Sequence, residues 1–165
     1  MKKMEEGSNK GGILADDMGL GKTVQSIALM LSRPSGPTKK PTLVVTPVAL
    51  MDQWRREILK LVRGNAALTV LLLHGQHAHL PWARVKQYDV VLTSYGTLSS
   101  ELRRKLKWEE KLKLNPDMKK SKKDEFPVLD DKAFFHRIFL DEAQNIKNRA
   151  TKTAMAACRV NAEFR

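Results

Sequence analysis

Five short apolar runs, each followed by a polar or helix-forming segment, constrain the fold of this chain more than any other feature of its sequence. The runs span Gly12–Ala15, Thr42–Thr46, Leu68–Leu73, Asp89–Thr93 and Arg137–Leu140. Most are continuous rather than alternating, which is typical of strands covered on both faces of a parallel sheet. Parallel neighbours need crossover connections. The sequence therefore predicts an α/β fold with a mostly parallel central sheet and helices on both faces.

The segments between these runs divide into helices and loops. Apolar residues recur at helical spacing in Lys22–Leu31, Val48–Val62, Thr97–Leu112 and Thr151–Val160. The stretch Ser32–Lys40 is rich in proline and glycine, which predicts a loop. Asn115–Asp131 is lysine-rich and poor in apolar residues. We therefore expect a mobile surface insertion at about 113–131 in an otherwise single domain.

The charge balance favours a polyanionic partner. Against 18 Asp and Glu stand 30 Lys and Arg, a formal net charge of +12, and nucleic acid is the commonest partner of such chains. The alternative is that the charge only keeps the chain soluble. Cys158 is the single cysteine, which excludes an intrachain disulfide, and we expect it in the core. No run approaches the ~20 apolar residues that span a bilayer, so we expect no membrane partner.

A phosphate-binding loop is predicted between the first apolar run and the first helix. Gly19 and Gly21 let backbone amides approach phosphate oxygens, and Lys22 can reach the β and γ phosphates of a nucleotide. The Thr23 hydroxyl can coordinate magnesium. The general pattern has glycine where this chain has Asp16, and the alternative is a plain turn into a helix. The predicted nucleotide-binding residues are Asp17, Met18, Gly19, Leu20, Gly21, Lys22, Thr23 and Val24.

A second acidic motif follows the last apolar run. Asp141 and Glu142 come directly after Ile138-Phe139-Leu140, so a parallel sheet delivers both carboxylates to its ligand-binding edge. We expect Asp141 to hold magnesium, directly or through water, and Glu142 to polarise the attacking water. Two acidic residues at a strand end are often only a solvated terminus. Their order after Lys22 and Thr23 favours a site for ATP and Mg²⁺.

These motifs resemble the Swi/Snf-type branch of the superfamily 2 helicases. Ile13–Gln25 is similar to motif I of that branch, which also lacks the first glycine, and Val44–Pro47 with Gln53 and Trp54 resembles motif Ia. Asp89–Tyr95 is similar to the next DNA-facing segment. Leu140–Asn148 resembles motif II, with Gln144 where many members have histidine. Gln144 and the lysine-rich insertion also resemble the fungal SUMO-targeted, RING-finger-bearing translocases.

The resemblance implies a RecA-like P-loop lobe that binds ATP and drives movement along double-stranded DNA, remodelling chromatin or other DNA-bound proteins in the nucleus. It implies an ATP hydrolase in which Lys22, Glu142 and Gln144 are catalytic. It also implies that the DNA backbone is lined by Thr46, Gln53, Thr93 and Tyr95, whose alternative role is strand-end capping. We expect the second lobe, with its arginine finger, to lie outside these residues, which leaves this partial first lobe little turnover alone.

Three further features have weaker interpretations. His74, His77 and His79 are a candidate metal cluster, although a surface loop is the simpler interpretation. Lys119–Lys123 is a candidate nuclear-import signal or DNA contact, and a merely solvated run of charge is the alternative. Trp54 is expected in the core rather than as a base-stacking platform. Two other functions stay open, a different P-loop enzyme such as a small kinase, and a DNA- or partner-binding fragment without hydrolysis.

Overall fold

The computed structural model describes residues 1–16, 19–36 and 40–165. The strands among these residues form a single five-stranded parallel sheet. The strand order is β2-β3-β1-β4-β5, and every neighbouring pair is parallel. Val44 of the central strand pairs with Leu92 on one side and with Phe139 on the other. The prediction of a mostly parallel sheet is therefore confirmed. The strands are β1 (Thr42–Thr46), β2 (Val70–Leu73), β3 (Val90–Ser94), β4 (Phe135–Leu140) and β5 (Ala162–Phe164).

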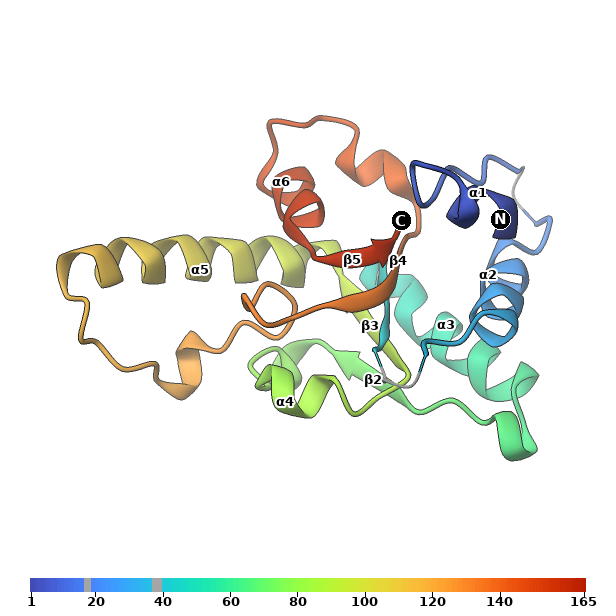
Figure 1. The fold of residues 1–165 in the computed structure, drawn as a ribbon, viewed down its shortest axis with the longest axis horizontal. Coiled ribbons are helices and arrows are strands. Elements are labelled where there is room, and N and C mark those ends of the chain that lie inside the picture. The colour runs from blue at the N-terminus through green and yellow to red at the C-terminus, as the bar shows by residue number, and fades with distance from the viewer. Residues whose placement is uncertain (17–18, 37–39) are drawn as a thin grey trace.

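Six α-helices connect or flank the strands in the described residues (Figure 1), and the four predicted ones are among them. α5 begins two residues earlier than expected because Ser94 caps it, with its hydroxyl oxygen accepting the Thr97 N–H at 3.1 Å. None of the helices in the described part of the chain combines the length and apolar character needed to cross a membrane. The helices are α1 (Lys2–Glu6), α2 (Lys22–Ser32), α3 (Val48–Leu61), α4 (Trp82–Val85), α5 (Tyr95–Leu114) and α6 (Lys152–Arg159).

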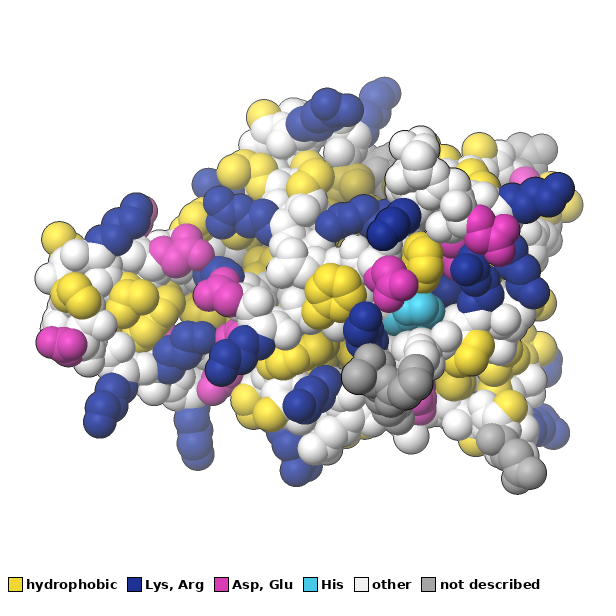
Figure 2. Space-filling view, viewed as in Figure 1, with side chains coloured by type: hydrophobic (Ala, Val, Ile, Leu, Met, Phe, Trp, Pro, Cys, Tyr) yellow, Lys and Arg dark blue, Asp and Glu magenta, His cyan; other side chains and the backbone are white. Residues whose placement is uncertain are grey.

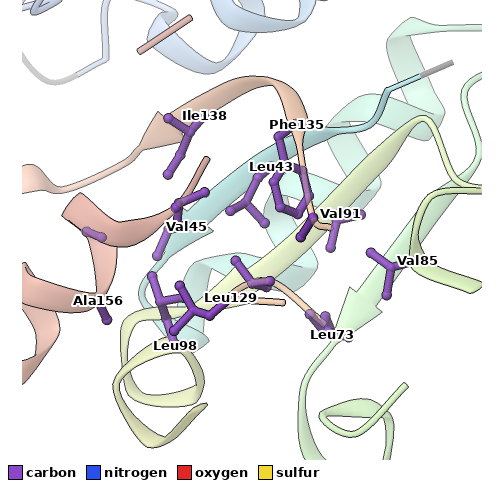
Figure 3. Packing of buried hydrophobic residues seen from close by; sticks show 14 of the residues in the cluster. Leu43, Val45, Leu73, Val85, Val91, Leu98, Leu129, Phe135, Ile138 and Ala156 are labelled. Atoms are coloured by element: carbon purple, nitrogen blue, oxygen red, sulfur yellow. The ribbon is translucent and has the colours of Figure 1, made fainter. Parts of the chain in front are cut away.

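The sheet is covered on both faces, as the continuous apolar runs predict. Successive side chains of a strand point to opposite faces, so Leu43 and Val45 of β1 belong to one core cluster and Val44 belongs to the other. α4, α5 and α6 cover the first face, whose packing is shown in Figure 3. α2 and α3 cover the second face. Burial on both faces explains why these strands are continuously apolar.

The first apolar run is not a strand. Gly12–Ala15 is irregular, and its backbone makes a single rung, in which the Gly12 N–H donates to the Arg165 carbonyl at 2.9 Å and the Arg165 N–H donates to Lys10 at 3.0 Å. One pair of backbone hydrogen bonds is too few to make this segment a strand of the sheet, and the Ile13 side chain is 84% exposed. The edge strand β5 was missed because three residues with a central glutamate carry no strand pattern.

The insertion differs from the mobile excursion that its composition predicts. Its first part is exposed, but Phe126, Val128 and Leu129 are buried at 2%, 1% and 4% exposure. Glu101, fully buried on α5, fixes this part, because its Oε1 accepts the N–H groups of Val128 at 2.8 Å and Leu129 at 2.7 Å. The second half of the insertion is therefore part of the core rather than a surface excursion, and it contains an apolar stretch that its lysine-rich neighbourhood obscures.

One further contact attaches the N-terminal helix to the sheet. Glu5 of α1 forms a buried bidentate pair with Arg137 of β4, with nitrogen-to-oxygen distances of 2.6 and 3.0 Å. The pair attaches the N-terminal helix to β4, the strand next to the central strand β1.

Cys158 was expected in the core but is exposed, because α6 turns Ala156 and Ala157 toward the sheet instead.

Candidate functional site

The two predicted motifs meet in one cleft at the carboxyl edge of the sheet. The cleft has a volume of about 570 Å³ and is lined by Lys22 and Thr23 from the start of α2 and by Asp141 and Glu142 from the end of β4. In a parallel sheet the strands end at a common edge, so residues more than a hundred positions apart converge there. The predicted meeting of the two motifs is therefore found in the structure.

The loop before α2 has the backbone that phosphate binding requires. Gly19 and Gly21 have φ values of 86° and 71°, a left-handed conformation that side-chain-bearing residues rarely adopt. Gly21 is the N-cap of α2, so the loop leads directly into a helix N-terminus, where the helix dipole favours an anion. Leu20 and Val24, two other predicted binding residues, are exposed. Asp17 and Met18 lie outside the described residues.

Asp16, where the general pattern has glycine, holds the loop together. Its backbone carbonyl accepts a hydrogen bond from Lys22 Nζ at 2.8 Å. Gln25, which the sequence reasoning did not single out, donates its amide to the Asp16 carboxylate and to the Leu20 carbonyl, both at 3.1 Å. The departure from the general pattern is therefore a structural support of the loop, made jointly by Asp16 and Gln25.

Asp141 is held in the cleft by two side-chain hydrogen bonds on one carboxylate oxygen. Its Oδ2 accepts hydrogen bonds from the Thr46 hydroxyl at 2.9 Å and from the Trp54 indole N–H at 2.8 Å. Its backbone is fixed as well, because Tyr95 donates its hydroxyl to the Asp141 carbonyl at 2.7 Å and the Asp141 N–H donates to Val45 at 2.9 Å. Within residues 1–16, 19–36 and 40–165, no hydrogen bond reaches Oδ1.

Glu142 has an unusual backbone conformation and contacts Gln144, which was also predicted to be catalytic. Its φ and ψ are 53° and 51°, in the left-handed region that favours glycine, and such strain is common at functional sites. The Gln144 side-chain amide donates to Glu142 Oε2, and the Asn145 amide donates to the Glu142 carbonyl at 2.7 Å. This turn aims the half-buried Glu142 carboxylate into the cleft.

Three of the four predicted DNA-contacting side chains are buried, which corrects that expectation. Thr46 and Thr93 are 0% exposed and Tyr95 is 7% exposed, so these side chains do not face a ligand surface. Thr93 instead donates its hydroxyl to the Leu73 carbonyl at 3.0 Å, while Thr46 and Tyr95 support Asp141. Burial, followed by the nearby charges of Asp141 and Glu142, raises the pKa of Tyr95 well above its usual range. Only Gln53 of the four is exposed, on α3.

The three histidines of the surface loop have separate surroundings. No group of three His, Cys, Asp or Glu side chains suited to a metal ion exists in the described parts of the chain. His74 forms a hydrogen bond through Nδ1 with the Thr97 hydroxyl at 2.9 Å. Burial and the charges of Arg104 and Lys123 lower the pKa of His79.

Trp54 lies in the core at 4% exposure, as expected.

Comparison with known proteins identifies the family. The sequence profile of the SNF2-related domain matches residues 1–165. The chain belongs to this family. A SNF2-family relative, an uncharacterized ATP-dependent helicase of Schizosaccharomyces pombe, is 41% identical over 167 residues, which cover 100% of this chain and 16% of that protein. ATP-dependent helicase ULS1 of Saccharomyces cerevisiae is 36% identical over 181 residues, which cover 99% of this chain and 11% of that protein.

A solved SNF2-family structure has the same architecture. The SWI2/SNF2 ATPase core of Sulfolobus solfataricus in complex with double-stranded DNA superposes with a TM-score of 0.61 at 28% identity, covering 92% of this chain and 25% of that chain. The sheet and its helices are therefore those of a RecA-like lobe. The SNF2-related chain spans only 11% to 16% of the length of the two relatives above.

The residues present fit a nucleotide with its magnesium ion. A glycine-shaped loop at a helix N-terminus suits phosphate oxygens, and Lys22 supplies a cation beside it. Hydroxyl and carboxylate oxygens are the protein ligands that magnesium prefers, and Thr23 and the Oδ1 side of Asp141 supply them. The SNF2-related domain thus brings a cation, a hydroxyl group and two carboxylates together in one cleft.

Proposed function

We propose that residues 1–165 form the ATP-binding lobe of a DNA-dependent ATPase that moves along duplex DNA and remodels protein–DNA complexes in the nucleus. The observation that carries this proposal is the convergence of Lys22 and Thr23 with Asp141 and Glu142 in one cleft of an SNF2-related domain. If the glycine loop were only a turn into a helix, nothing would require two carboxylates to lie opposite it across a cleft. The SUMO-targeted branch remains a prediction about the longer protein.

The side chains divide the chemistry between them. The amides of the glycine loop and Lys22 bind and orient the β and γ phosphates. Thr23 and Asp141 hold the magnesium ion, which when bound neutralises charge on the phosphate oxygens. Glu142 orients the attacking water and accepts its proton, and Gln144 holds the Glu142 carboxylate in place.

DNA binding by this lobe is proposed to be weak and independent of sequence. The net charge of +12 supports a polyanion, and the superposed core of Sulfolobus solfataricus is in complex with double-stranded DNA. On α3, the side chains of Gln53, Arg55 and Arg56 are exposed, and the Gln53 amide donates to Glu57 at 3.0 Å. Amide and guanidinium groups donate to phosphate oxygens, which position a protein on DNA without reading its bases.

The lobe is proposed to bind ATP much better than it hydrolyses it. Asp141 and Glu142 provide for the metal and the water, but charge also develops on the transferred γ-phosphoryl group. An arginine finger that neutralises this charge contributes about 10³–10⁵ in rate, roughly 4–7 kcal/mol of barrier. We propose that this arginine belongs to a second lobe. DNA-stimulated turnover should therefore require a longer protein that contains both lobes.

Replacing Lys22 tests the site directly. Lys22→Ala should abolish the magnesium-dependent binding of ATP measured by calorimetry, because the phosphate charge loses its facing cation. Lys86→Ala is a matched control, since Lys86 is exposed just after α4 and away from the cleft. Binding by Lys22→Ala as tight as that of the parent would show that the cleft is not a phosphate site.

A further inference from the structure

We propose that Trp54 is a positioning residue for the magnesium site. With Thr46 it reserves Oδ2 of Asp141, so that Oδ1 is the oxygen offered to the cation. The inference rests on the proposed function, because it assigns a role within the same cleft. It is carried by hydrogen bonds that join α3 and β1 to the end of β4.

Both donors on Oδ2 are fixed in direction. The Trp54 indole N–H can only donate, and Thr46 Oγ1 is placed at the carboxyl end of β1 with its side chain fully buried. The Trp54 ring is 4% exposed and lies in the same core cluster as Ile58 and Val44. Close packing prevents the ring from turning its N–H elsewhere. The two donors therefore keep their positions and fix the orientation of the Asp141 carboxylate, instead of moving with it.

Without these donors the carboxylate could present either oxygen. The terminal torsion of an aspartate is broad and roughly twofold, so its two oxygens exchange at little cost when nothing distinguishes them. Hydrogen bonds to an ionised carboxylate are stronger than those between neutral groups. Two such bonds at 2.9 and 2.8 Å on Oδ2 remove the choice before any ligand arrives. A cation that binds Oδ1 then meets a side chain that is already oriented.

The backbone of Asp141 is held from the opposite side. The Tyr95 hydroxyl donates to its carbonyl at 2.7 Å, and its own N–H donates to Val45 at 2.9 Å. Position and rotation of the carboxylate are thus controlled separately, the first by β1 and α5 and the second by Thr46 and Trp54. Partners that orient a metal ligand in this way typically change metal affinity by about 10–100-fold when they are removed.

The experiment removes the indole N–H and keeps the aromatic bulk. In Trp54→Phe, magnesium titrations of ATP binding followed by calorimetry should show about tenfold weaker magnesium dependence. ATP binding in the presence of a chelator should stay as in the parent. Trp108→Phe is the matched control, because Trp108 is also buried, at 8% exposure, but lies on α5 outside the cleft.

Thr46 gives a second pair of variants with little change of volume. Thr46→Val removes the hydroxyl donor and should weaken magnesium-dependent binding in the same direction as Trp54→Phe. Thr46→Ser keeps the hydroxyl and should restore binding close to that of the parent. A merely structural role would lower the melting temperature of these variants without separating magnesium-dependent from magnesium-independent binding. This comparison keeps the test decisive if Trp54→Phe folds poorly.

A spectroscopic measurement reads the hydrogen bond without any ligand. In proton–nitrogen correlation spectra the indole N–H groups of the 3 tryptophans give separate signals, and Asp141→Asn should shift the Trp54 signal most strongly. Unchanged magnesium dependence in both Trp54→Phe and Thr46→Val, or equal loss with and without magnesium, would overturn the positioning role. Those results would leave the phosphate site intact as long as Lys22→Ala still abolishes ATP binding, so the two proposals fail separately.

Discussion

Two carboxylates in different regions of the molecule have the same hydrogen-bond pattern and different surroundings. Asp141 in the cleft and Glu101 under the insertion each accept two hydrogen bonds on one oxygen. In each, the other oxygen accepts none from the described residues. Asp141 is half-buried at the edge of a cleft, whereas Glu101 is 0% exposed.

The comparison shows that access, rather than hydrogen bonding, separates a ligand site from a structural support. The open oxygen of Asp141 faces space that a cation can enter. The open oxygen of Glu101 faces packed side chains, and burial raises the pKa of Glu101 to about 7 despite two backbone N–H groups and the charges of Arg104 and Lys105. One carboxylate is therefore expected to serve ligand binding and the other the attachment of the insertion.

The largest expected effect separates the insertion from the cleft. Phe126→Ala should lower the free energy of unfolding by about 3–5 kcal/mol, because the ring is buried and its removal leaves a cavity. Chemical denaturation measures the loss, and calorimetry on the folded variant should give unchanged ATP affinity. If Phe126→Ala bound ATP more weakly although it was fully folded, the insertion would contribute to ATP binding in the cleft.

A substitution in the cleft should have the opposite result, weaker ATP binding with little change in stability. Asp141→Asn keeps the shape of the side chain but removes its charge, so magnesium-dependent ATP binding should fall by about a hundredfold, or about 3 kcal/mol. The midpoint of thermal unfolding should change little, since an amide oxygen still accepts from Thr46 and Trp54. A large loss of stability with normal magnesium binding would reverse the assignment of the two carboxylates.

Glu101 should make stability depend on pH. Its folded pKa of about 7 lies above the ordinary value of 4.5, so its contribution to stability is full below about pH 4.5 and is lost as the pH rises through 7. Between pH 5 and pH 8 the parent should lose about 2 kcal/mol from this group. Glu101→Gln keeps an acceptor for Val128 and Leu129 and should lack this loss in denaturation series at both pH values. Parallel curves for parent and variant would contradict the assignment.

The smallest effect concerns the exposed lysines of the insertion. Figure 2 shows Lys and Arg side chains projecting from the end of the molecule that α5 forms, and Lys119, Lys122 and Lys123 are exposed in the insertion that follows this helix. Replacing these three by glutamine should weaken duplex binding by less than about tenfold and lower the salt slope by about 0.9 for each phosphate that is no longer bound. Two unrelated duplexes should respond alike. An unchanged slope would show that these three lysines contact no phosphate.

Local sequence was sufficient to predict most of the sheet and the outline of the cleft. Four of the apolar runs are strands because burial on both faces leaves a continuous apolar signature. Lys22, Thr23, Asp141 and Glu142 were predictable because a parallel sheet brings its carboxyl ends together whatever the separation along the chain.

The supports of the site were not predictable, because they depend on contacts between distant residues. Trp54 and Asp141 lie 87 positions apart, and no local pattern shows that an indole in the core also donates to the Asp141 carboxylate. A glutamate within a lysine-rich helix looks solvated, so the burial of Glu101 was invisible. The side chains of Thr46 and Tyr95 resemble DNA-facing positions, but their contacts with Asp141 form only when β1, α5 and β4 are packed together.

The pair between Glu5 and Arg137 imposes an order on events during synthesis. The two residues are 132 positions apart, so at roughly 5–20 residues per second the ribosome needs on the order of ten seconds to deliver the arginine after the glutamate. Until then α1 has its ion pairs with Arg33, through Glu5 and Glu6, but lacks Arg137. The phosphate loop that follows α1 likewise lacks the strand that carries the facing carboxylates. The nucleotide cleft is therefore among the last parts of the nascent lobe to form.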